Sequence, residues 1–330
     1  MDGPVTVVVG FPVRDEVLDA IGRVDPRVQV VHLPGIARPG GAGPEAEEWK
    51  RQLATADVLF GPTSIAREYI EAAPNLGWFQ VINAGVDRLA NEGLLERGFV
   101  VTNVSGLVAV SIAEWVMGTV LMLAKNLHQA VRTQGERRWN AWRVGELAGQ
   151  TMGIAGLGAI GRETARRARA FDMRVVASRR TAPPGAADPD CDEVVPYEDL
   201  ERLLRESDFL VLCVPLTPET HHLVGARELA MMKPTATLVN IARGAVVDQD
   251  ALIAALRDGT IAAAALDVFD PEPLPPESPL WGMDNVIMTP HVSGSIEGYG
   301  RRSAELFLEN LGRFMAGEKL ENVVDPKLGY

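Results

Sequence analysis

Residues 152–161 of the chain read Met152-Gly-Ile-Ala-Gly156-Leu-Gly158-Ala-Ile-Gly161. An apolar, strand-like run leads into the pattern G-x-G-x-x-G, and a helix-like run, Arg162–Phe171, follows it. In such a turn the first glycine permits a tight bend, the second lets the backbone approach a pyrophosphate, and the third allows close packing of helix on strand. The flanking strand and helix therefore predict a dinucleotide-binding loop with contacts from Gly156, Leu157, Gly158, Ala159, Ile160 and Gly161.

The next strand-like run, Arg174–Ala177, ends in Ser178-Arg179-Arg180. Sheets that bind NAD usually carry an Asp or Glu at this point, which accepts a hydrogen bond from the ribose 2′-OH. Two guanidinium groups instead suit a 2′-phosphate, which they grip with paired hydrogen bonds. The alternative is that both arginines are solvated loop residues. We expect Ser178, Arg179 and Arg180 to contact the cofactor, NADPH to be preferred, and NAD to remain usable.

Strand-like and helix-like runs alternate through most of the chain, a pattern typical of parallel sheets covered by helices. The helix-like runs include Ile65–Ala73, Val86–Arg97, Leu107–Leu127 and Tyr299–Met315, and Pro39–Pro44 is predicted to be a loop. The strand candidates form an earlier and a later series, which together predict an α/β fold with two doubly wound parallel sheets. The earlier series is Val5–Val9, Val28–Val31, Asp57–Phe60, Trp78–Ile82 and Phe99–Thr102; the later is Met152–Ala155, Arg174–Ala177, Phe209–Val214, Thr237–Ile241, Ala262–Val268 and Val286–Met288.

Composition narrows the class of protein. The chain has 330 residues and a formal net charge of −12, which argues against binding to nucleic acid or to an anionic membrane surface. Its two cysteines, Cys191 and Cys213, lack metal-like spacing and fit a reducing, cytoplasmic setting. The longest apolar tract, Leu107–Ala124, carries Ser111 and Glu114, so a buried helix is favoured over a membrane span. No targeting signal is visible.

Polar side chains follow three strands of the later series. Arg243 follows Thr237–Ile241, Asp267 and Glu272 follow the next strand, and His291 follows Val286–Met288. Ligands of open parallel sheets bind beyond the carboxyl ends of the strands, which is also where the glycine loop lies. Arginine can hold a carboxylate with two hydrogen bonds, and histidine is the usual acid–base group at neutral pH. This set suits the reduction of a 2-keto acid, with Asp267 placed to engage a nicotinamide amide.

At these positions the chain resembles the D-isomer-specific 2-hydroxyacid dehydrogenase family. The resemblance extends over nearly the whole chain, including weaker matches at Asn83-Ala84-Gly85-Val-Asp87 and Pro215-Leu-Thr-Pro-Glu-Thr220. The chain departs from the common pattern mainly at Ser178-Arg179-Arg180. The matching motifs are the glycine loop, Val239-Asn-Ile-Ala-Arg243-Gly-Ala-Val-Val-Asp248, Ala265-Leu-Asp267-Val-Phe-Asp-Pro-Glu272-Pro-Leu, Thr289-Pro-His291 and the tail Gly317-Glu-Lys-Leu-Glu-Asn-Val-Val-Asp325.

The resemblance implies roles for individual residues. His291 would be the proton donor, Glu272 its carboxylate partner, and Arg243 the clamp on the substrate carboxylate. The backbone at Asn83, Ala84 and Gly85 would bind the substrate, as would Arg243 and His291. The further cofactor contacts that it implies are Val214, Pro215, Thr220, Ile241, Ala242, Arg243, Asp267 and His291.

The resemblance also implies a discontinuous architecture. Residues 1–103 and 291–330 would form a smaller, flavodoxin-like substrate domain, into which a Rossmann cofactor domain of residues 104–290 is inserted. The active site would lie in the cleft between them, with hinges near Asn103 and His291. The family's habit implies a homodimer. Trp139 and Trp142 would then either reach a second subunit or pack locally, and the sequence does not decide between these readings.

The leading functional hypothesis is an NAD(P)-dependent oxidoreductase that interconverts a small 2-keto acid, of the glyoxylate or hydroxypyruvate kind, and a D-2-hydroxy acid. One alternative is a dinucleotide-sensing protein, like the corepressors built on this fold. Another is a phosphite-type dehydrogenase of the same superfamily. No G-x-S-x-G elbow or Walker-type lysine loop is present, which disfavours hydrolase and nucleoside-triphosphatase readings.

Overall fold

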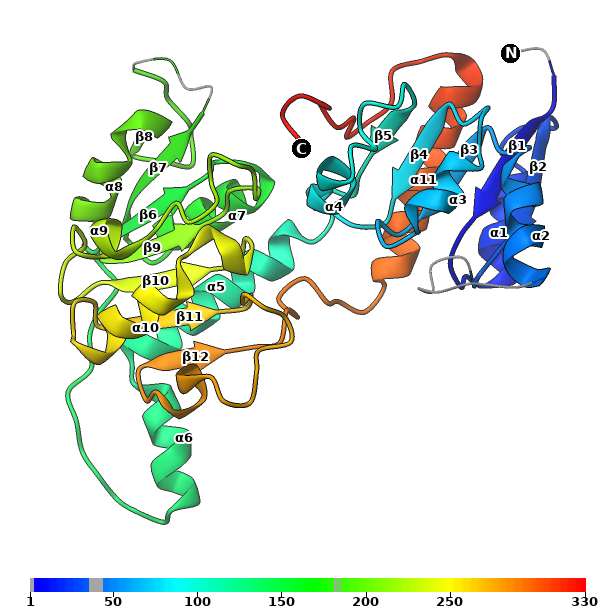
Figure 1. Ribbon diagram of the computed structural model, residues 1–330. Helices are drawn as coiled ribbons and strands as arrows, with labels where there is room; N and C mark the ends of the chain where they lie inside the picture. Colours follow the sequence, from blue (N-terminus) through cyan, green and yellow to red (C-terminus); the bar gives the residue numbers. More distant parts are fainter. Residues whose placement is uncertain (1–2, 36–43, 181–182, 184) are drawn as a thin grey trace. The chain divides into compact units, whose positions relative to one another are not determined.

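The computed structural model describes residues 3–35, 44–180, 183 and 185–330. The predicted loop Pro39–Pro44 therefore lies outside the described residues, apart from Pro44. The chain divides into two compact units, one of Met1–Leu107 with Glu297–Tyr330 and one of Val108–Ile296. The two boundaries lie a few residues later in the chain than predicted from the sequence, after Leu107 rather than 103 and after Ile296 rather than 290. Each unit is an α/β body around a parallel sheet, which confirms the predicted fold class (Figure 1).

The first unit contains a five-stranded sheet in the order β2-β1-β3-β4-β5, with every neighbouring pair parallel. This is the flavodoxin-like order, in which ligands approach the carboxyl ends of the strands. Each strand lies within two residues of its predicted bounds, because short β-branched runs between turn residues are a strong strand signal. The strands are β1 (Val5–Val9), β2 (Val28–His32), β3 (Val58–Gly61), β4 (Trp78–Val81) and β5 (Val100–Thr102).

Alternating side chains of these strands build two separate cores. Val5, Val7 and Val9 pack with helices α1 (Asp15–Gly22) and α11 (Tyr299–Ala316), whereas Val8 belongs to the opposite cluster. That second cluster includes side chains of α2 (Pro44–Leu53), α3 (Arg67–Glu71) and α4 (Asp87–Asn91). The period of two therefore places one layer of helices on each face of the sheet.

Helix α11 returns the end of the chain to the first unit. Its Phe307 is fully buried and stacks on Phe60 of β3, with ring centroids 4.1 Å apart and planes 1° from parallel. The same ring stacks on Trp78 of β4 at 5.2 Å. Buried aromatic contacts of this kind make the C-terminal helix part of the N-terminal core.

The second unit contains a seven-stranded parallel sheet in the order β12-β11-β10-β9-β6-β7-β8. The chain starts at β6, adds β7 and β8 on one side, and then crosses back to add β9 to β12 on the other side, which is the Rossmann order. The strands are β6 (Thr151–Ala155), β7 (Arg174–Arg179), β8 (Glu193–Pro196), β9 (Phe209–Leu212), β10 (Thr237–Asn240), β11 (Ala263–Leu266) and β12 (Val286–Met288). Strand β8 was not predicted, since this short edge strand begins with Glu193 and ends in a proline.

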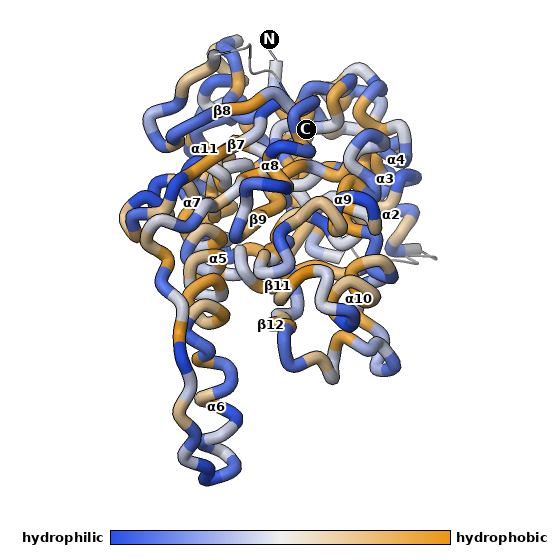
Figure 2. The backbone as a smooth tube through the Cα atoms, turned by 90° about the vertical axis from the view of Figure 1, so that its left-hand side faces the viewer, coloured by the Kyte–Doolittle hydropathy of each residue, from blue (hydrophilic) through white to orange (hydrophobic). Residues whose placement is uncertain are grey.

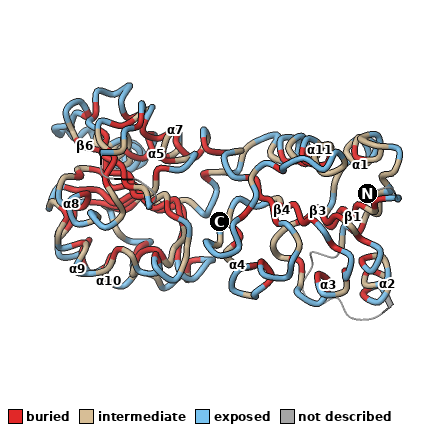
Figure 3. The backbone as a smooth tube through the Cα atoms, turned by 90° about the horizontal axis from the view of Figure 1, so that it is seen from above, coloured by how far each residue is buried: buried red, intermediate tan, exposed pale blue. Residues whose placement is uncertain are grey.

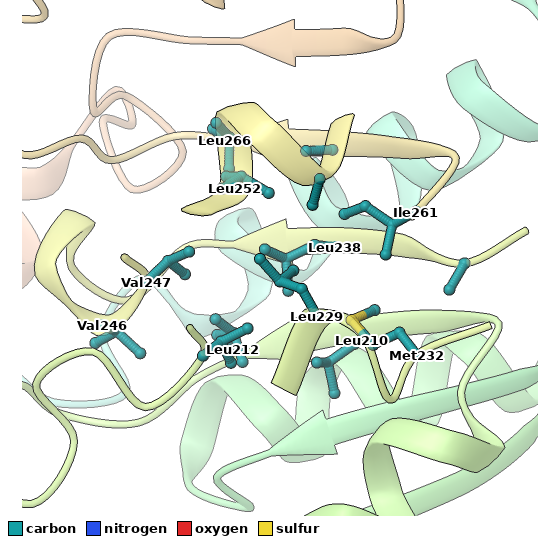
Figure 4. Packing of buried hydrophobic residues seen from close by; sticks show 14 of the residues in the cluster. Leu210, Leu212, Leu229, Met232, Leu238, Val246, Val247, Leu252, Ile261 and Leu266 are labelled. Atoms are coloured by element: carbon teal, nitrogen blue, oxygen red, sulfur yellow. The ribbon is translucent and has the colours of Figure 1, made fainter. Parts of the chain in front are cut away.

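Helices cover both faces of this sheet. Leu210, Leu212 and Leu238 pack in one cluster with side chains of α8 (Leu200–Glu206), α9 (Ala226–Leu229) and α10 (Gln249–Arg257). Figure 4 shows part of this cluster, including Leu229 of α9 and Leu252 of α10. The opposite face carries α5 (Ala109–Ala124) and α7 (Ala159–Arg169), which pack against each other. Figure 3 shows the central strands of each unit as its most buried parts. Short 3₁₀ turns complete the fold at Tyr197–Asp199, Gly244–Val246 and Pro279–Gly282.

The helix expected over Leu107–Leu127 is α5, which ends three residues earlier than predicted. A second helix that was not predicted, α6 (Leu127–Gly135), begins after Asn126, whose φ of 53° is left-handed. Within the second unit, α6 and the segment after it extend away from the sheet (Figure 2). Among the described residues, no single helix is long and apolar enough to cross a membrane. The pair α5 and α6 would pass such a test together by length and composition, but it is bent by 67°.

Candidate active site

The glycine loop follows β6 at the carboxyl edge of the second sheet, and its three glycines have different surroundings. A Cβ on Gly156, whose φ is +102°, would lie 2.8 Å from the Cys213 carbonyl oxygen. A Cβ on Gly161 would lie 2.3 Å from the Gly156 carbonyl oxygen, whereas one on exposed Gly158 would meet nothing within 4 Å. Gly156 and Gly161 are therefore required by the fold itself. Gly158 leaves open space at the N-terminus of α7, which fits a bound pyrophosphate.

The end of β7 lies beside this loop, because the N–H groups of Gly156 and Leu157 donate to the Ser178 carbonyl at 3.1 and 3.0 Å. Ser178 is buried, and Arg179 is the last residue of the strand. The Nε of Arg179 is buried and has no hydrogen-bond partner among the described residues. A buried guanidinium N–H without an acceptor is costly, so this atom fits an anionic ligand such as a 2′-phosphate.

Exposed Arg180 follows, and its charge acts on the loop after β9. The Thr217 hydroxyl, and to a smaller degree Arg180, lower the pKa of Glu219. Within that loop the Thr220 hydroxyl donates to the Pro215 carbonyl at 2.6 Å and accepts from the Thr217 N–H at 2.8 Å. The hydroxyl of Thr220 thus braces the loop that flanks the glycine turn. Val214 is buried at its start and Pro215 is exposed, and their cofactor contacts stay predictions, as does that of Thr220.

His291 and Glu272 meet although 19 residues separate them. The Nδ1 of His291 lies 2.9 Å from Oε2 of Glu272, and the Phe269 N–H donates to Oε1 of the same carboxylate at 3.0 Å. The histidine side chain is half exposed, and its backbone adopts a left-handed φ of 54°. Because the carboxylate engages Nδ1, it favours the tautomer with a proton on that atom and leaves Nε2 free for a ligand.

Arg243 is positioned by two neighbours that the sequence did not single out as functional. Buried Asn240 accepts from the Ala242 N–H at 3.0 Å and donates to the Arg243 carbonyl at 3.0 Å, which fixes the turn after β10. A Cβ on Gly244 would lie 2.0 Å from the Phe269 carbonyl carbon and oxygen. The turn that bears Arg243 is therefore packed directly against the loop that leads to Glu272. Ile241 and Ala242, which precede Arg243 in this turn, are buried.

Asp267 is buried at the end of β11, and its carboxylate is already engaged. Oδ1 accepts the Val292 N–H at 2.9 Å and the Thr289 hydroxyl, while Oδ2 accepts the Ser293 N–H at 2.9 Å. Its main-chain carbonyl accepts the His291 N–H at 2.8 Å. Asp267 thus holds the turn that presents His291, and its contact with a nicotinamide amide stays a prediction.

In the first unit, Asn83, Ala84 and Gly85 follow β4. The side chain of Asn83 accepts from the Thr63 N–H at 3.0 Å, and the Ala84 carbonyl accepts from Nδ2 of Asn103 at 2.9 Å. The N–H groups of Ala84, Gly85 and Val86 have no acceptor among the described residues. Three successive N–H groups that no described residue accepts from form a surface that suits a carboxylate.

The description of the family that matches this chain is "D-isomer specific 2-hydroxyacid dehydrogenase, NAD binding domain", and the match covers residues 117–293. This range is more than half of the chain. The chain belongs to the D-isomer specific 2-hydroxyacid dehydrogenase family.

Individual relatives agree with this assignment. A glyoxylate reductase of Thermofilum pendens is 38% identical over 86% of this chain and 86% of its own length. A D-3-phosphoglycerate dehydrogenase of Methanocaldococcus jannaschii is 38% identical over 84% of this chain, which spans 53% of that relative. A family structure from Xanthobacter autotrophicus, in complex with NADPH and MES, superposes with a TM-score of 0.83 at 32% identity, covering 99% and 100% of the two chains.

As a member of this family, the chain is an oxidoreductase of 2-hydroxy acids that uses a nicotinamide dinucleotide. The structure brings Glu272 and His291 together and packs the turn of Arg243 against the same loop. Three residues that hold these turns occupy similar places in the sequence. Asn240 is the last residue of β10, Asp267 directly follows β11, and Asn103 directly follows β5. A polar residue at a strand end does not reveal from sequence whether it binds a ligand or holds a turn.

Proposed function

We propose that this protein is an NADPH-preferring reductase of small 2-keto acids, of the glyoxylate or hydroxypyruvate kind, with D-2-hydroxy acids as products. The observation that carries the proposal is the Glu272–His291 pair at the carboxyl edge of a dinucleotide-binding sheet. The glyoxylate reductase of Thermofilum pendens is the relative that supports the choice of substrate.

In this reaction a bound dihydronicotinamide supplies the hydride that reduces C2 of the keto acid. His291 donates the proton to the ketone oxygen from Nε2, because Nδ1 is engaged by Glu272. Glu272 stabilises the protonated ring and fixes its orientation through the Phe269 N–H. The products are a hydroxy acid and the oxidised dinucleotide, and the histidine is reprotonated from solvent.

Recognition of the substrate carboxylate is assigned to two groups. The N–H groups of Ala84 and Gly85 offer neutral donors without protein acceptors among the described residues. Arg243 offers a guanidinium that can hold a carboxylate with two hydrogen bonds and polarise the adjacent carbonyl. The turn held by Asn240 and Gly244 supports Arg243 in this role.

The preference for NADPH rests on Arg179 and Arg180. The buried Nε of Arg179, which has no hydrogen-bond partner in the described part of the chain, and the charge of Arg180 both suit a 2′-phosphate at the end of β7. NADPH should therefore exceed NADH in kcat/KM by about tenfold or more, which corresponds to about 1.4 kcal/mol. In a variant with both Arg179→Ala and Arg180→Ala, most of this preference for NADPH over NADH should be lost. Arg174→Ala, at the other end of the same strand, is the matched control.

The test of the function is the initial rate of NADPH and NADH oxidation with glyoxylate, hydroxypyruvate, pyruvate and a bulkier aryl 2-keto acid. Turnover of glyoxylate, together with formation of the D enantiomer from hydroxypyruvate or pyruvate, supports the proposal. Equal kcat/KM with the two cofactors would contradict the proposed NADPH preference but not the proposed reaction. No turnover with any keto acid, despite measurable dinucleotide binding, would overturn the function and favour a sensor.

We further propose a homodimer formed through α6 and residues 136–146. Trp139 is 99% exposed in the single chain, which rules out local packing for this residue, and Trp142 is 36% exposed. Val131 of α6 and Val144 of the segment after it are also exposed, and α6 projects from the rest of the second unit (Figure 2). Exposed apolar side chains gathered on one segment are typical of a contact surface. Light scattering should give twice the chain mass for the wild type and a smaller mass for Trp139→Glu.

A further inference from the structure

The loop after β4 is held by segments distant in sequence. The Tyr299 hydroxyl, from the start of α11, donates to the Ile82 carbonyl at 2.5 Å. The side chain of Asn83 accepts from Thr63, after β3. The Ala84 carbonyl accepts from the Asn103 side chain, after β5. The main-chain carbonyl groups of Ile82 and Ala84 are thus turned toward other parts of the first unit.

The bond to the Ala84 carbonyl also sets the direction of the next N–H. The peptide unit that joins Ala84 to Gly85 is planar and trans, so its C=O and N–H point in opposite directions. Nδ2 of Asn103, at 2.9 Å from the oxygen, therefore makes the Gly85 N–H point away from Asn103. This N–H has no acceptor among the described residues.

Asn103 is well placed to act as a fixed support. It is only 6% exposed, and the oxygen of its side chain accepts the Ser105 N–H at 3.0 Å while the nitrogen reaches Ala84. Both ends of the carboxamide are therefore engaged. A side chain that is held at both ends cannot rotate without losing two hydrogen bonds.

The C-terminal tail holds Asn103 in turn. The Asn103 N–H donates to the Asn322 carbonyl at 3.1 Å, and Nδ2 of Asn322 donates to the Asn103 and Ser105 carbonyls at 3.3 and 2.9 Å. Asn322 has a left-handed φ of 54°. Fully buried Asn310 of α11 anchors this part of the tail through two hydrogen bonds with the main chain of Glu321.

We propose that the Asn103 carboxamide, held by Asn322 of the C-terminal tail, is the positioning group that aims the Gly85 N–H at the carboxylate of the substrate. This inference rests on the proposed function. It makes the tail a support of substrate binding as well as of the fold, although more than two hundred residues separate Asn322 from Gly85.

Three substitutions test this role. Asn103→Ala removes the donor to Ala84. Asn103→Asp replaces it with an oxygen that repels the Ala84 carbonyl and adds negative charge near the bound anion. Asn322→Gly removes the tail carboxamide but tolerates the left-handed backbone. The matched control is Asn75→Ala. Asn75 is exposed and, like Asn103, donates to a main-chain carbonyl of the first unit, that of Ala54 at 3.4 Å. Asn75 precedes β4, however, and so does not contact the loop that follows this strand.

The measurements are kcat and KM with glyoxylate, Kd for NADPH, Kd for the unreactive keto-acid analogue oxamate, and Tm. We expect KM and the oxamate Kd to rise about tenfold in Asn103→Ala, more in Asn103→Asp and less in Asn322→Gly. The value of kcat should fall by less than about threefold, and Kd for NADPH should stay within about twofold of the wild type. Asn75→Ala should match the wild type in every measurement.

A purely structural role for Asn103 would lower Tm and the active fraction while leaving KM and the oxamate Kd unchanged, and that result would overturn the inference. If Asn103→Ala does not fold, the same oxamate comparison on Asn322→Gly decides the matter. Absence of keto-acid turnover by the wild type would instead overturn the proposed function. Normal wild-type turnover with unchanged oxamate binding in the variants would reject the positioning role alone.

Discussion

The main-chain N–H of Phe269 donates to Oε1 of Glu272 at 3.0 Å, which leaves Oε2 to meet His291. Two residues earlier, the carboxylate and carbonyl of Asp267 hold the turn that carries His291. Gly244, next to Arg243, packs on the Phe269 carbonyl. The segment just after β11 is therefore the common support of all three proposed catalytic side chains.

The first prediction concerns the Glu272–His291 pair. His291→Ala should lower kcat by about 10²–10⁴-fold, the usual contribution of a general acid. Glu272→Gln should lower kcat by a smaller factor, because the amide cannot stabilise a protonated ring and can support either tautomer. For both variants kcat is measured from initial rates. The Kd for NADPH is measured as well, and it should be the same as in the wild type. Glu277→Gln, an exposed residue of the same loop, is the control; full activity of His291→Ala would refute the assignment.

Local patterns accounted for most of what the sequence predicted. The glycine loop was found because strand, turn and helix are contiguous, and the strands because short β-branched runs between turns are distinctive. The candidate residues Arg243, Glu272 and His291 were found because each follows a strand of one sheet. The return of the C-terminal helix to the first unit came only from the resemblance, since no local signal places Phe307 against Phe60 and Trp78.

The parts that were missed depend on contacts between distant residues. The sequence does not show that the Asn103 side chain reaches Ala84, or that the carboxylate of Asp267 is taken up by residues 289–293. In each case the deciding interaction is tertiary and overrides the local propensity.

A second prediction separates the glycines of the loop by their surroundings. Gly158→Ala should fold with nearly unchanged stability, because the added Cβ meets no protein atom within 4 Å, but should weaken NADPH binding by about tenfold or more. Gly161→Ala should be destabilised, since its Cβ would lie 2.3 Å from the Gly156 carbonyl oxygen. Chemical denaturation and a fluorescence titration with NADPH measure the two effects. Unchanged NADPH affinity in Gly158→Ala would count against a pyrophosphate at this turn.

A third prediction tests the contribution of the C-terminal helix to the first core. Phe307→Ala should lower the free energy of unfolding by about 3–5 kcal/mol, as expected for removal of a fully buried, stacked ring. Denaturant unfolding followed by tryptophan fluorescence measures this loss, and Trp78 lies directly against the missing ring. Leu328→Ala is the control, because that side chain is 38% exposed near the end of the tail. A loss below about 1 kcal/mol in Phe307→Ala would show that the helix contributes little to the core.

The last prediction distinguishes a bracing role for Asp267 from cofactor binding. Both of its carboxylate oxygens accept main-chain N–H groups, from Val292 and Ser293. Asp267→Asn puts an NH₂ group against one of these donors, so the turn loses a charge-assisted hydrogen bond in a buried site, at a cost of about 1.5–3 kcal/mol.

Because this turn presents His291, kcat should fall in Asp267→Asn along with the free energy of unfolding, whereas Kd for NADPH should change little. Calorimetry, steady-state kinetics and a fluorescence titration give the three quantities. Asp284→Asn is the control, since the Asp284 side chain is 86% exposed and pairs with Arg132 at the surface, where ion pairs contribute little. A large loss of NADPH affinity with normal stability would instead assign the Asp267 carboxylate to the cofactor.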